Sequence, residues 1–377
     1  MNRERWIEDE LAGMRDRHLL RTLSPLPAVG GKIEIAGKPW LNFASNDYLD
    51  LSQHPLVIEA AREALAKFGT GATASRLVAG TLDLHEQLEQ KLAAHKGHPA
   101  SLIFGSGYLA NIGIITALAS DGDLILADKI VHASILDAAK LSGAKLLRFR
   151  HNDVEHLRAL ATHAKDFRRA LVVTESVFSM DGDLAPLADI AIIARETGAM
   201  MMVDEAHSTG VFPAHGLENK INLSMFTMSK ALGGYGGGVA CSTVMRNWLI
   251  NRARSFIYTT ALPPSVIAAS IAAVDLLDEH PNWGAELLRR AATFRAALKS
   301  HGLDTLNSAS QIVPVLIGDN EKTVAVAKRL REKQILVAAI RPPTVPSGTA
   351  RLRLSLTLAH SDADLENAAA AIAEAVR

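Results

Sequence analysis

A single lysine, Lys230, lies in the stretch MFTMSKALGGYGGG, between small hydroxyl residues and a run of glycines. The apolar residues 223–227 before it are typical of a buried strand, so the lysine follows a strand end. The glycines after it leave the backbone sterically open. A lysine in this position suits a covalent bond to a bulky carbonyl cofactor, for which its amine is the nucleophile.

A second apolar run, AMMMVDEAHSTG, brings Asp204 to a strand end, with His207 following it. An aspartate beside a pyridine nitrogen keeps that nitrogen protonated, and the ring then accepts electrons from a substrate carbanion. His207 suits a hydrogen bond to a phenolic oxygen on the same ring. The pair therefore complements a lysine that holds a pyridine aldehyde.

Two further motifs follow predicted strands. The turn GSGY, 105–108, opens a helix at Gly107 and Tyr108, where backbone N–H groups and the positive helix end suit a phosphate. A tight turn is the alternative reason for these glycines. His132, in DKIVHASILD, is typical of a structural histidine unless a flat group lies against it. Together with Lys230 and Asp204, these residues predict a site for pyridoxal 5′-phosphate.

Two stretches also fit nucleotide-binding motifs, but the sequence lacks the neighbouring features that those motifs require. The letters VDEAH also fit a helicase-type NTPase, but that class needs a phosphate loop of the form G-x-x-x-x-G-K-[ST], which the chain lacks. The stretch GTGATA, 69–74, loosely matches the fingerprint of nicotinamide-dependent dehydrogenases. It follows a helical pattern and not a strand, so we interpret it as a turn.

The elements that position these motifs alternate between short apolar runs and helical patterns. Strands are predicted at 101–104, 124–127, 145–149, 171–174, 200–203 and 223–227. This rhythm predicts an α/β fold with a mostly parallel sheet, in which ligands bind outside the carboxyl ends of the strands. After Pro281 two strand-like pieces, SQIVPVLIG and ARLRLSLT, lie among helices. We expect an N-terminal segment at 1–45, a large cofactor-binding α/β domain at 46–280 and a small α+β domain at 281–377.

The bulk composition excludes several kinds of partner. Forty Lys and Arg residues balance forty Asp and Glu residues, which gives no electrostatic reason to expect nucleic acid or a membrane surface. The single cysteine, Cys241, and an N-terminus without a signal-peptide core favour a cytoplasmic protein. The apolar stretch 102–120 is long enough for a membrane span, but its Gly-Ser-Gly turn and Asn111 favour a strand and a buried helix. No metal site is predicted.

Four motifs, TESVFSMDGD, VDEAHSTG, TMSKALGG and IRPPTVPSGTARLRLSLT, resemble those of the α-oxoamine synthases, which are pyridoxal-phosphate enzymes of fold type I. The resemblance runs from about Arg21 to His360. With FASNDYLDLS, it implies a homodimeric acyltransferase that condenses L-alanine with a pimeloyl thioester in biotin biosynthesis. The alternative is the sister reaction of glycine with acetyl-CoA, because the two enzymes share the cofactor site and differ only in residues near the substrates. A non-catalytic subunit would lack the lysine. The motifs do not distinguish coenzyme A from a carrier protein as the acyl carrier.

The resemblance also implies roles for residues around the cofactor. Lys230 would be the Schiff-base lysine, Asp204 the partner of the ring nitrogen, and His132 the side chain stacked on the ring. Further cofactor contacts would come from Gly107, Tyr108, Ser179, His207, Thr227 and, across the subunit interface that forms the active site, Thr260.

Substrate contacts are implied in the same way. Arg353 would bind the alanine carboxylate, for which a bidentate guanidinium is well suited. Strand alternation places Arg351 on the same face, so periodicity alone does not choose between the two. The other implied substrate-binding residues are Arg21, Asn46, His132, Arg341 and Thr344. The loop GTGATASRLVAG, 69–80, departs from a more glycine-rich version in the family.

Overall fold

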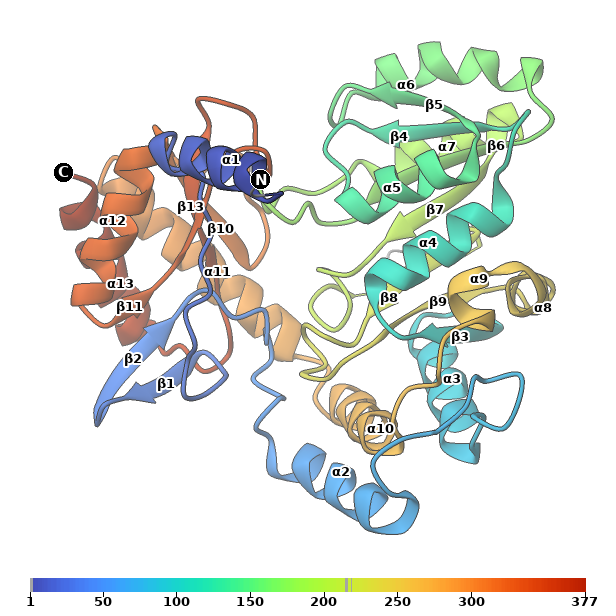
Figure 1. Cartoon of the computed structure of the whole chain (residues 1–377), viewed down its shortest axis with the longest axis horizontal. Coiled ribbons are helices and arrows are strands. Elements are labelled where there is room, and N and C mark those ends of the chain that lie inside the picture. Colours follow the sequence, from blue (N-terminus) through green and yellow to red (C-terminus); the bar gives the residue numbers. More distant parts are fainter. Residues whose placement is uncertain (1–2, 214–215, 218) are drawn as a thin grey trace. The chain divides into compact units, whose positions relative to one another are not determined.

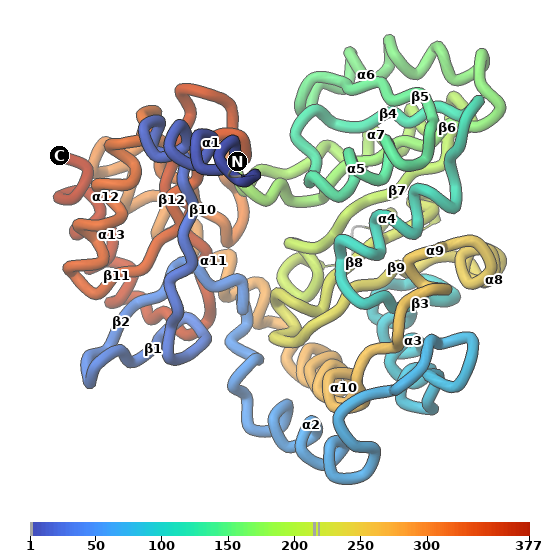
Figure 2. The backbone as a smooth tube through the Cα atoms, viewed as in Figure 1, coloured from blue at the N-terminus to red at the C-terminus, as the bar shows by residue number. Residues whose placement is uncertain are grey.

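The computed structural model describes residues 3–213, 216–217 and 219–377. The chain divides into two compact units (Figures 1 and 2). The larger unit comprises Leu49–Ser179 and Leu184–Ala285, and the smaller unit comprises Met1–Tyr48, Met180–Asp183 and Glu286–Arg377.

The larger unit is built on one seven-stranded sheet, ordered β3-β9-β8-β7-β6-β4-β5. Its strands are β3 (Ala100–Phe104), β4 (Leu124–Asp128), β5 (Lys145–Phe149), β6 (Ala170–Glu175), β7 (Met200–Asp204), β8 (Leu223–Thr227) and β9 (Gly237–Cys241). Strands β4 to β8 pair in parallel, whereas β9 runs antiparallel to both β3 and β8. The predicted α/β fold with a mostly parallel sheet is confirmed, and all six predicted strands are present.

Strand β9 is not among the predicted strands because its sequence, GGVAC, begins with two glycines, which are depleted in strands. Packing explains them. A Cβ on Gly237 would lie 2.5 Å from the backbone nitrogen of Gly107, and one on Gly238 would lie 2.5 Å from the ring of Phe226. Only glycine lets β9 approach the start of α4 and the Phe226 ring of β8 this closely.

Helices cover both faces of the sheet, because each strand buries alternate side chains on opposite sides (Figure 1). In β4, Ile125 and Ala127 pack on one face and Leu124 and Leu126 on the other. The first face is covered by α4 (Gly107–Leu118), α5 (Ala133–Ser142), α8 (Thr243–Arg252) and α9 (Arg254–Ile257), and the second by α6 (Val154–Ala161) and α7 (Leu187–Thr197). The result is a three-layer α/β/α unit.

Beside β3 lies a group of three further helices, α2 (Pro55–Phe68), α3 (Asp83–His95) and α10 (Pro264–Glu279). The apolar stretch 102–120 divides into β3, a turn and the twelve-residue helix α4, as the sequence predicts. No helix in the described part of the chain is both long and apolar enough to cross a membrane.

The smaller unit holds two three-stranded sheets. One has the order β1-β2-β11, formed by β1 (Lys32–Ile35), β2 (Lys38–Asn42) and β11 (Ile335–Leu336), and the other has the order β10-β13-β12, formed by β10 (Ile312–Gly318), β13 (Ala350–Ser355) and β12 (Ala338–Ile340). Its helices are α1 (Arg5–Asp16), α11 (Trp283–Ser300), α12 (Asn320–Glu332) and α13 (Asp362–Val376).

The N-terminal residues belong to the same unit as the C-terminal residues. Strand β11 pairs in parallel with β2, Ile335 opposite Leu41 and Leu336 opposite Asn42. The domain organisation predicted from the sequence has a separate segment at 1–45 and a boundary between the large and small domains at 281. In the structure the units divide after Tyr48 and before Glu286, and a four-residue insert, Met180–Asp183, joins the smaller unit. A pairing between residues about 290 positions apart leaves no local signal in a sequence.

Candidate active site

The larger unit gathers most of the predicted cofactor residues at one edge of its sheet. The parallel strands end at the same edge, and the polar side chains follow those ends. They are Gly107 and Tyr108 after β3, His132 after β4, Ser179 after β6, Asp204 and His207 at and after β7, and Thr227 and Lys230 at and after β8.

Asp204 is buried, with 5% of its surface exposed, and its carboxylate accepts bonds from two directions. The backbone N–H of Ala206 donates to Oδ1 at 3.0 Å, and Asn111 Nδ2 donates to Oδ2 at 2.9 Å. Asn111 Nδ2 also bonds to Ser134 Oγ at 2.9 Å. Among the described residues Asn111 Oδ1 has no partner although it is buried, which costs about 1–3 kcal/mol. The sequence singled out Asn111 only as a polar residue in an apolar stretch.

His132 forms the N-cap of α5, and its backbone and ring are held separately. Its N–H donates to Glu175 Oε1 at 2.6 Å, and its ring Nδ1 lies 2.8 Å from Ser134 Oγ. The backbone of Ser179 bonds to the same Glu175 carboxyl. Burial, followed by the charge of Asp204, raises the pKa of Glu175 well above its usual range. Glu175 thus anchors two predicted site residues; it lies within the motif TESVFSMDGD, but the sequence assigned it no role.

The backbone around Lys230 is fixed by hydrogen bonds and close packing. Thr227 Oγ1 donates to the carbonyl of Gly236 at 2.8 Å, and the Lys230 carbonyl accepts the N–H of Gly233 at 2.8 Å. Gly233 has a φ of 63° and Gly236 a φ of 117°, conformations that favour glycine. A Cβ on Gly233 would also lie 2.4 Å from the backbone nitrogen of Ser52. The glycines therefore shape a tight turn that presents the partly buried Lys230.

The residues at this edge fit pyridoxal 5′-phosphate. Helix α4 begins at Gly107 with Ser106 as its N-cap, and first-turn N–H groups suit a phosphate. A Cβ at Gly107 would lie 3.0 Å from Met225 Cε, so glycine preserves the space there. The donor set also matches, because Asp204 offers a buried carboxylate and Lys230 an amine. The buried, unpartnered Oδ1 of Asn111 lies on the same network.

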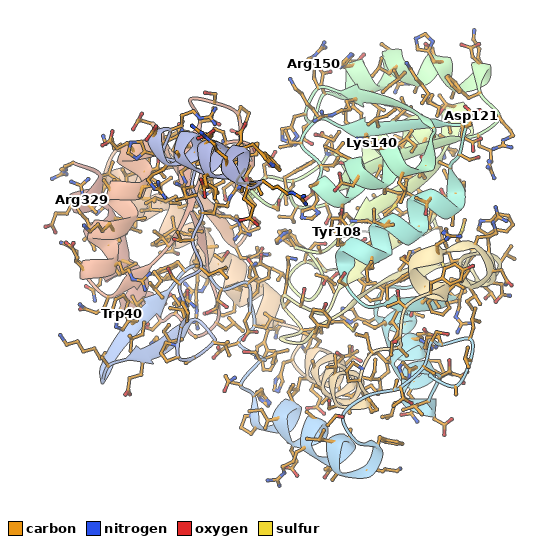
Figure 3. The ribbon with its side chains drawn as sticks, in the orientation of Figure 1. Trp40, Tyr108, Asp121, Lys140, Arg150 and Arg329 are labelled. Carbon is orange, nitrogen blue, oxygen red and sulfur yellow. The ribbon has the colours of Figure 1, made fainter. Side chains whose placement is uncertain are left out.

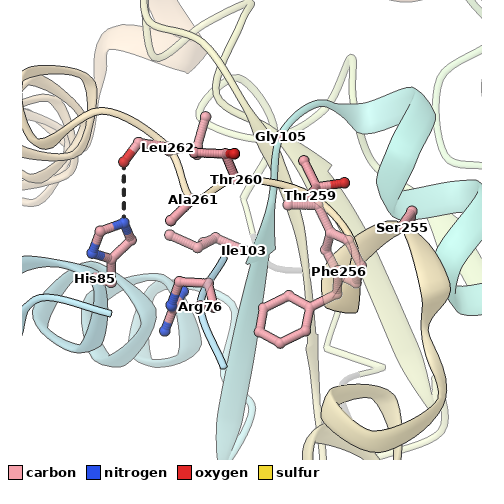
Figure 4. A pocket seen from close by; sticks show the side chains of 11 residues that line it. Arg76, His85, Ile103, Gly105, Ser255, Phe256, Thr259, Thr260, Ala261 and Leu262 are labelled. Atoms are coloured by element: carbon pink, nitrogen blue, oxygen red, sulfur yellow. Dashed lines mark hydrogen bonds between the residues drawn. The ribbon is translucent and has the colours of Figure 1, made fainter. Parts of the chain in front are cut away.

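Tyr108 and Thr260 lie in different surroundings within the larger unit. Tyr108, labelled in Figure 3, is 45% exposed and donates its phenolic hydrogen to Asp137 Oδ2 at 2.7 Å. This bond raises the pKa of Tyr108. Thr260 is exposed, pairs with Ser75 across a β-bridge and lines a small cavity (Figure 4). Near it, His85 Nε2 bonds to the Leu262 carbonyl at 3.2 Å. The predicted contact of Thr260 with a partner subunit stays a prediction.

The smaller unit brings Arg353 and Asn46 together. Arg353 is 5% exposed and donates from Nη1 to Asn46 Oδ1 at 3.1 Å and to Ser355 Oγ at 2.7 Å. The phenol of Tyr48, whose pKa is raised by burial, donates to the same Asn46 oxygen at 3.2 Å. Arg351 instead forms an ion pair with the carboxylate of Asp181. The two arginines that periodicity leaves equivalent thus have different surroundings.

A second cluster in the smaller unit contains three of the other implied substrate-binding residues. Arg21 donates from Nη2 to Thr344 Oγ1 at 3.3 Å. Arg341 donates to the backbone carbonyl of His18. Burial lowers the pKa of Arg341, and the positive charge of Arg21 nearby lowers it further. Two like charges held close together form a favourable place for an anion.

Comparisons with known proteins agree with these features. A model of the family described as aminotransferase class I and II matches residues 38–372. An 8-amino-7-oxononanoate synthase from Geobacter sulfurreducens is 46% identical over 98% of this chain and 97% of its own length. A solved serine palmitoyltransferase from S. paucimobilis with bound PLP–myriocin is 32% identical, with a TM-score of 0.92 over 99% of this chain and 97% of that chain. A solved 8-amino-7-oxononanoate synthase from Francisella tularensis is 29% identical, with a TM-score of 0.77 over 89% of this chain and 98% of that chain.

Proposed function

Because the chain belongs to the class I and II aminotransferase family and is a pyridoxal-phosphate-dependent enzyme of the α-oxoamine synthase type, we propose that it condenses L-alanine with a pimeloyl thioester in biotin biosynthesis. The products would be 8-amino-7-oxononanoate, carbon dioxide and the free thiol. Relatives that share 43–47% of their residues over nearly the whole chain and carry the name of this activity support the proposal.

The cofactor would be held by residues of the larger unit. When bound, pyridoxal phosphate supplies a carbonyl for the lysine amine and an electron-withdrawing ring that stabilises negative charge at the amino acid Cα. Lys230 would hold it through its amine, and Asp204 would hold the ring nitrogen. The remaining holding residues would be Gly107, Tyr108, Ser179, His132, His207, Thr227 and, from a second copy of the chain in a homodimer, Thr260.

Different side chains of this chain would bind alanine, transfer its Cα proton and stabilise the developing charge. Arg353 would bind the carboxylate through its rigid guanidinium and so orient the Cα–H bond. The Lys230 amine, once free, would accept the Cα proton as a general base and later return one. Asp204 would keep a negative charge opposite the ring nitrogen throughout. His132 would donate a hydrogen bond to the thioester carbonyl as its oxygen gains charge.

The choice of acyl chain rests on the pair Arg21 and Arg341. A pimeloyl chain ends in a second carboxylate, whereas acetyl and palmitoyl chains end in a methyl group. Two guanidinium groups close enough for one to lower the pKa of the other suit a terminal carboxylate. Thr344, which accepts a hydrogen bond from Arg21, adds a hydroxyl to the same cluster. This juxtaposition favours pimeloyl over acetyl and palmitoyl thioesters.

A substrate panel tests the proposal. Thiol release is measured with alanine plus pimeloyl-CoA, glycine plus acetyl-CoA, and serine plus palmitoyl-CoA. We expect kcat/KM to favour the first pair by about tenfold or more. Arg21→Ala should raise the KM for pimeloyl-CoA by about tenfold, because it removes a hydrogen bond between charged groups, whereas the control Arg17→Ala, an exposed arginine, should not. Faster turnover of either other pair would contradict the assignment.

A further inference from the structure

Two buried side chains connect Asp204 to His132, and no motif in the sequence identified them as a pair. We propose that Asn111 and Ser134 are positioning residues that fix His132 in the tautomer with its hydrogen on Nε2. We call the series of hydrogen bonds from Asp204 through Asn111 and Ser134 to His132 the relay. With its hydrogen on Nε2, His132 can donate a hydrogen bond to an acceptor outside the relay. The relay depends only on residues of the larger unit. Its use toward the thioester carbonyl rests on the proposed function.

The direction of the relay is set at Asp204. An ionised carboxylate only accepts hydrogen bonds, so the Asn111 amide must present its nitrogen to Asp204 Oδ2, 2.9 Å away. The same NH2 group has a second hydrogen, which it donates to Ser134 Oγ at 2.9 Å. The opposite orientation would bring the amide oxygen of Asn111 against the carboxylate oxygen. Asp204 therefore fixes the Asn111 amide, although Asn111 Oδ1 is left buried without a partner among the described residues.

The direction continues through Ser134 to the imidazole. A serine hydroxyl has one hydrogen, and Ser134 Oγ already accepts from Asn111, so it donates to His132 Nδ1 at 2.8 Å. The backbone N–H of Ser134 also points at Nδ1, at 3.3 Å. An atom that accepts two hydrogen bonds carries a lone pair. The neutral ring of His132 must then carry its hydrogen on Nε2.

The surroundings make the relay rigid. Asn111 is 1% exposed and Ser134 fully buried, so water does not compete for their bonds. Asn111 lies on α4 and Ser134 in the first turn of α5, two helices that pack against each other. The backbone of His132 is held by Glu175, and the residue as a whole is exposed. Helix capping alone does not require the Ser134 hydroxyl, because the backbone N–H of Ser134 already supplies the capping bond.

The test is nuclear magnetic resonance of the protein labelled with 15N-histidine, with and without cofactor. The His132 signals are assigned by their loss in His132→Gln. In the wild type we expect one tautomer, protonated at Nε2. In Ser134→Ala only the longer bond from the backbone N–H, 3.3 Å, still favours the Nε2–H form, so the Nδ1–H form should rise severalfold. Ser134→Thr, which keeps a hydroxyl, should restore the wild-type spectrum. In Asn111→Leu the tautomer should also become mixed although Ser134 is present, because its hydroxyl is no longer oriented.

Turnover provides the second readout. Ser134→Ala should lower kcat for thioester condensation by about tenfold, roughly 1.4 kcal/mol, with little change in cofactor affinity or in the KM for alanine. Wild-type spectra in both Ser134→Ala and Asn111→Leu would overturn the relay, whatever their activity. If the spectra change as expected but the wild-type protein does not use alanine and pimeloyl-CoA, the relay stands and the proposed function fails.

Discussion

Replacing Arg353 by alanine should weaken alanine binding, whereas replacing Arg351 should not. Both arginines lie on β13 and are almost fully buried, and Arg351 forms an ion pair with Asp181. Arg353 donates to the Asn46 amide oxygen and to the Ser355 hydroxyl, at 3.1 and 2.7 Å. These two bonds orient the guanidinium, and a substrate carboxylate would add a hydrogen bond between charged groups.

The expected magnitude follows from the hydrogen bond that each substitution removes. A hydrogen bond to a charged group contributes about 1.5–3 kcal/mol. At about 1.4 kcal/mol per tenfold, Arg353→Ala should raise the Kd for alanine by about tenfold to a hundredfold. Arg353→Lys should fall between, because lysine keeps the charge but loses the bidentate geometry. Arg351→Ala should instead lower the stability of the fold by about 1–3 kcal/mol, since Asp181 is 23% exposed and only partly desolvated when left alone.

The assay pairs alanine titration, followed by the absorbance of the bound cofactor, with thermal unfolding of the same variants. Arg353→Ala should lower the affinity for alanine, and Arg351→Ala should lower the thermal stability. If Arg351→Ala loses alanine affinity while Arg353→Ala binds normally, the assignment on β13 is wrong. If both variants lose stability and neither loses affinity, the carboxylate is bound elsewhere.

Three other perturbations have defined outcomes. Asp204→Asn should keep the cofactor but slow alanine Cα–H exchange in D2O, followed by proton NMR, by about a hundredfold, because a neutral amide does not hold a ring-nitrogen proton; normal exchange would refute this role. Inactive Lys230→Ala and weakly active Thr260→Ala proteins, mixed after dissociation, should regain activity in mixed dimers if Thr260 serves the partner's site, and no gain would contradict that arrangement. Burial lowers the pKa of His360 from 6.5 to about 4, so between these pH values the unfolded chain binds more protons than the folded chain. The free energy of unfolding should therefore fall by about 3 kcal/mol as the pH drops through this range. His360→Asn should lose this pH dependence in denaturant titrations, and an unchanged dependence would show that another group causes it.

The sequence predicts the sheet and its carboxyl edge because both depend on local patterns. Short apolar runs between helical segments define β4 to β8, and the topology of a parallel sheet then brings Asp204 and Lys230 to one edge. Strand β9 is not predictable in this way, since the glycines at 237 and 238 report tertiary contacts and not strand propensity. The same limit applies to β2 and β11, whose pairing joins distant parts of the chain.

The candidate site divides along similar lines. Lys230 and Asp204 stand out because chemistry requires those residue types directly after strands. Glu175, Asn111 and Ser134 do not, because a buried glutamate, amide or hydroxyl acquires its role only from the atoms packed around it. Asn111 illustrates this, since its sequence neighbours are apolar and its hydrogen-bond partners, Ser134 and Asp204, are 23 and 93 positions away.

The most direct measurement of the central claim follows the carboxyl carbon of alanine. The holoprotein is incubated with L-[1-13C]alanine and pimeloyl-CoA, and carbon dioxide, free thiol and product are quantified by mass spectrometry. We predict equal amounts of 13CO2, coenzyme A and unlabelled 8-amino-7-oxononanoate, with none formed by Lys230→Ala. Label retained in the product, thiol release without carbon dioxide, or full activity in Lys230→Ala would contradict a decarboxylative condensation that depends on this lysine.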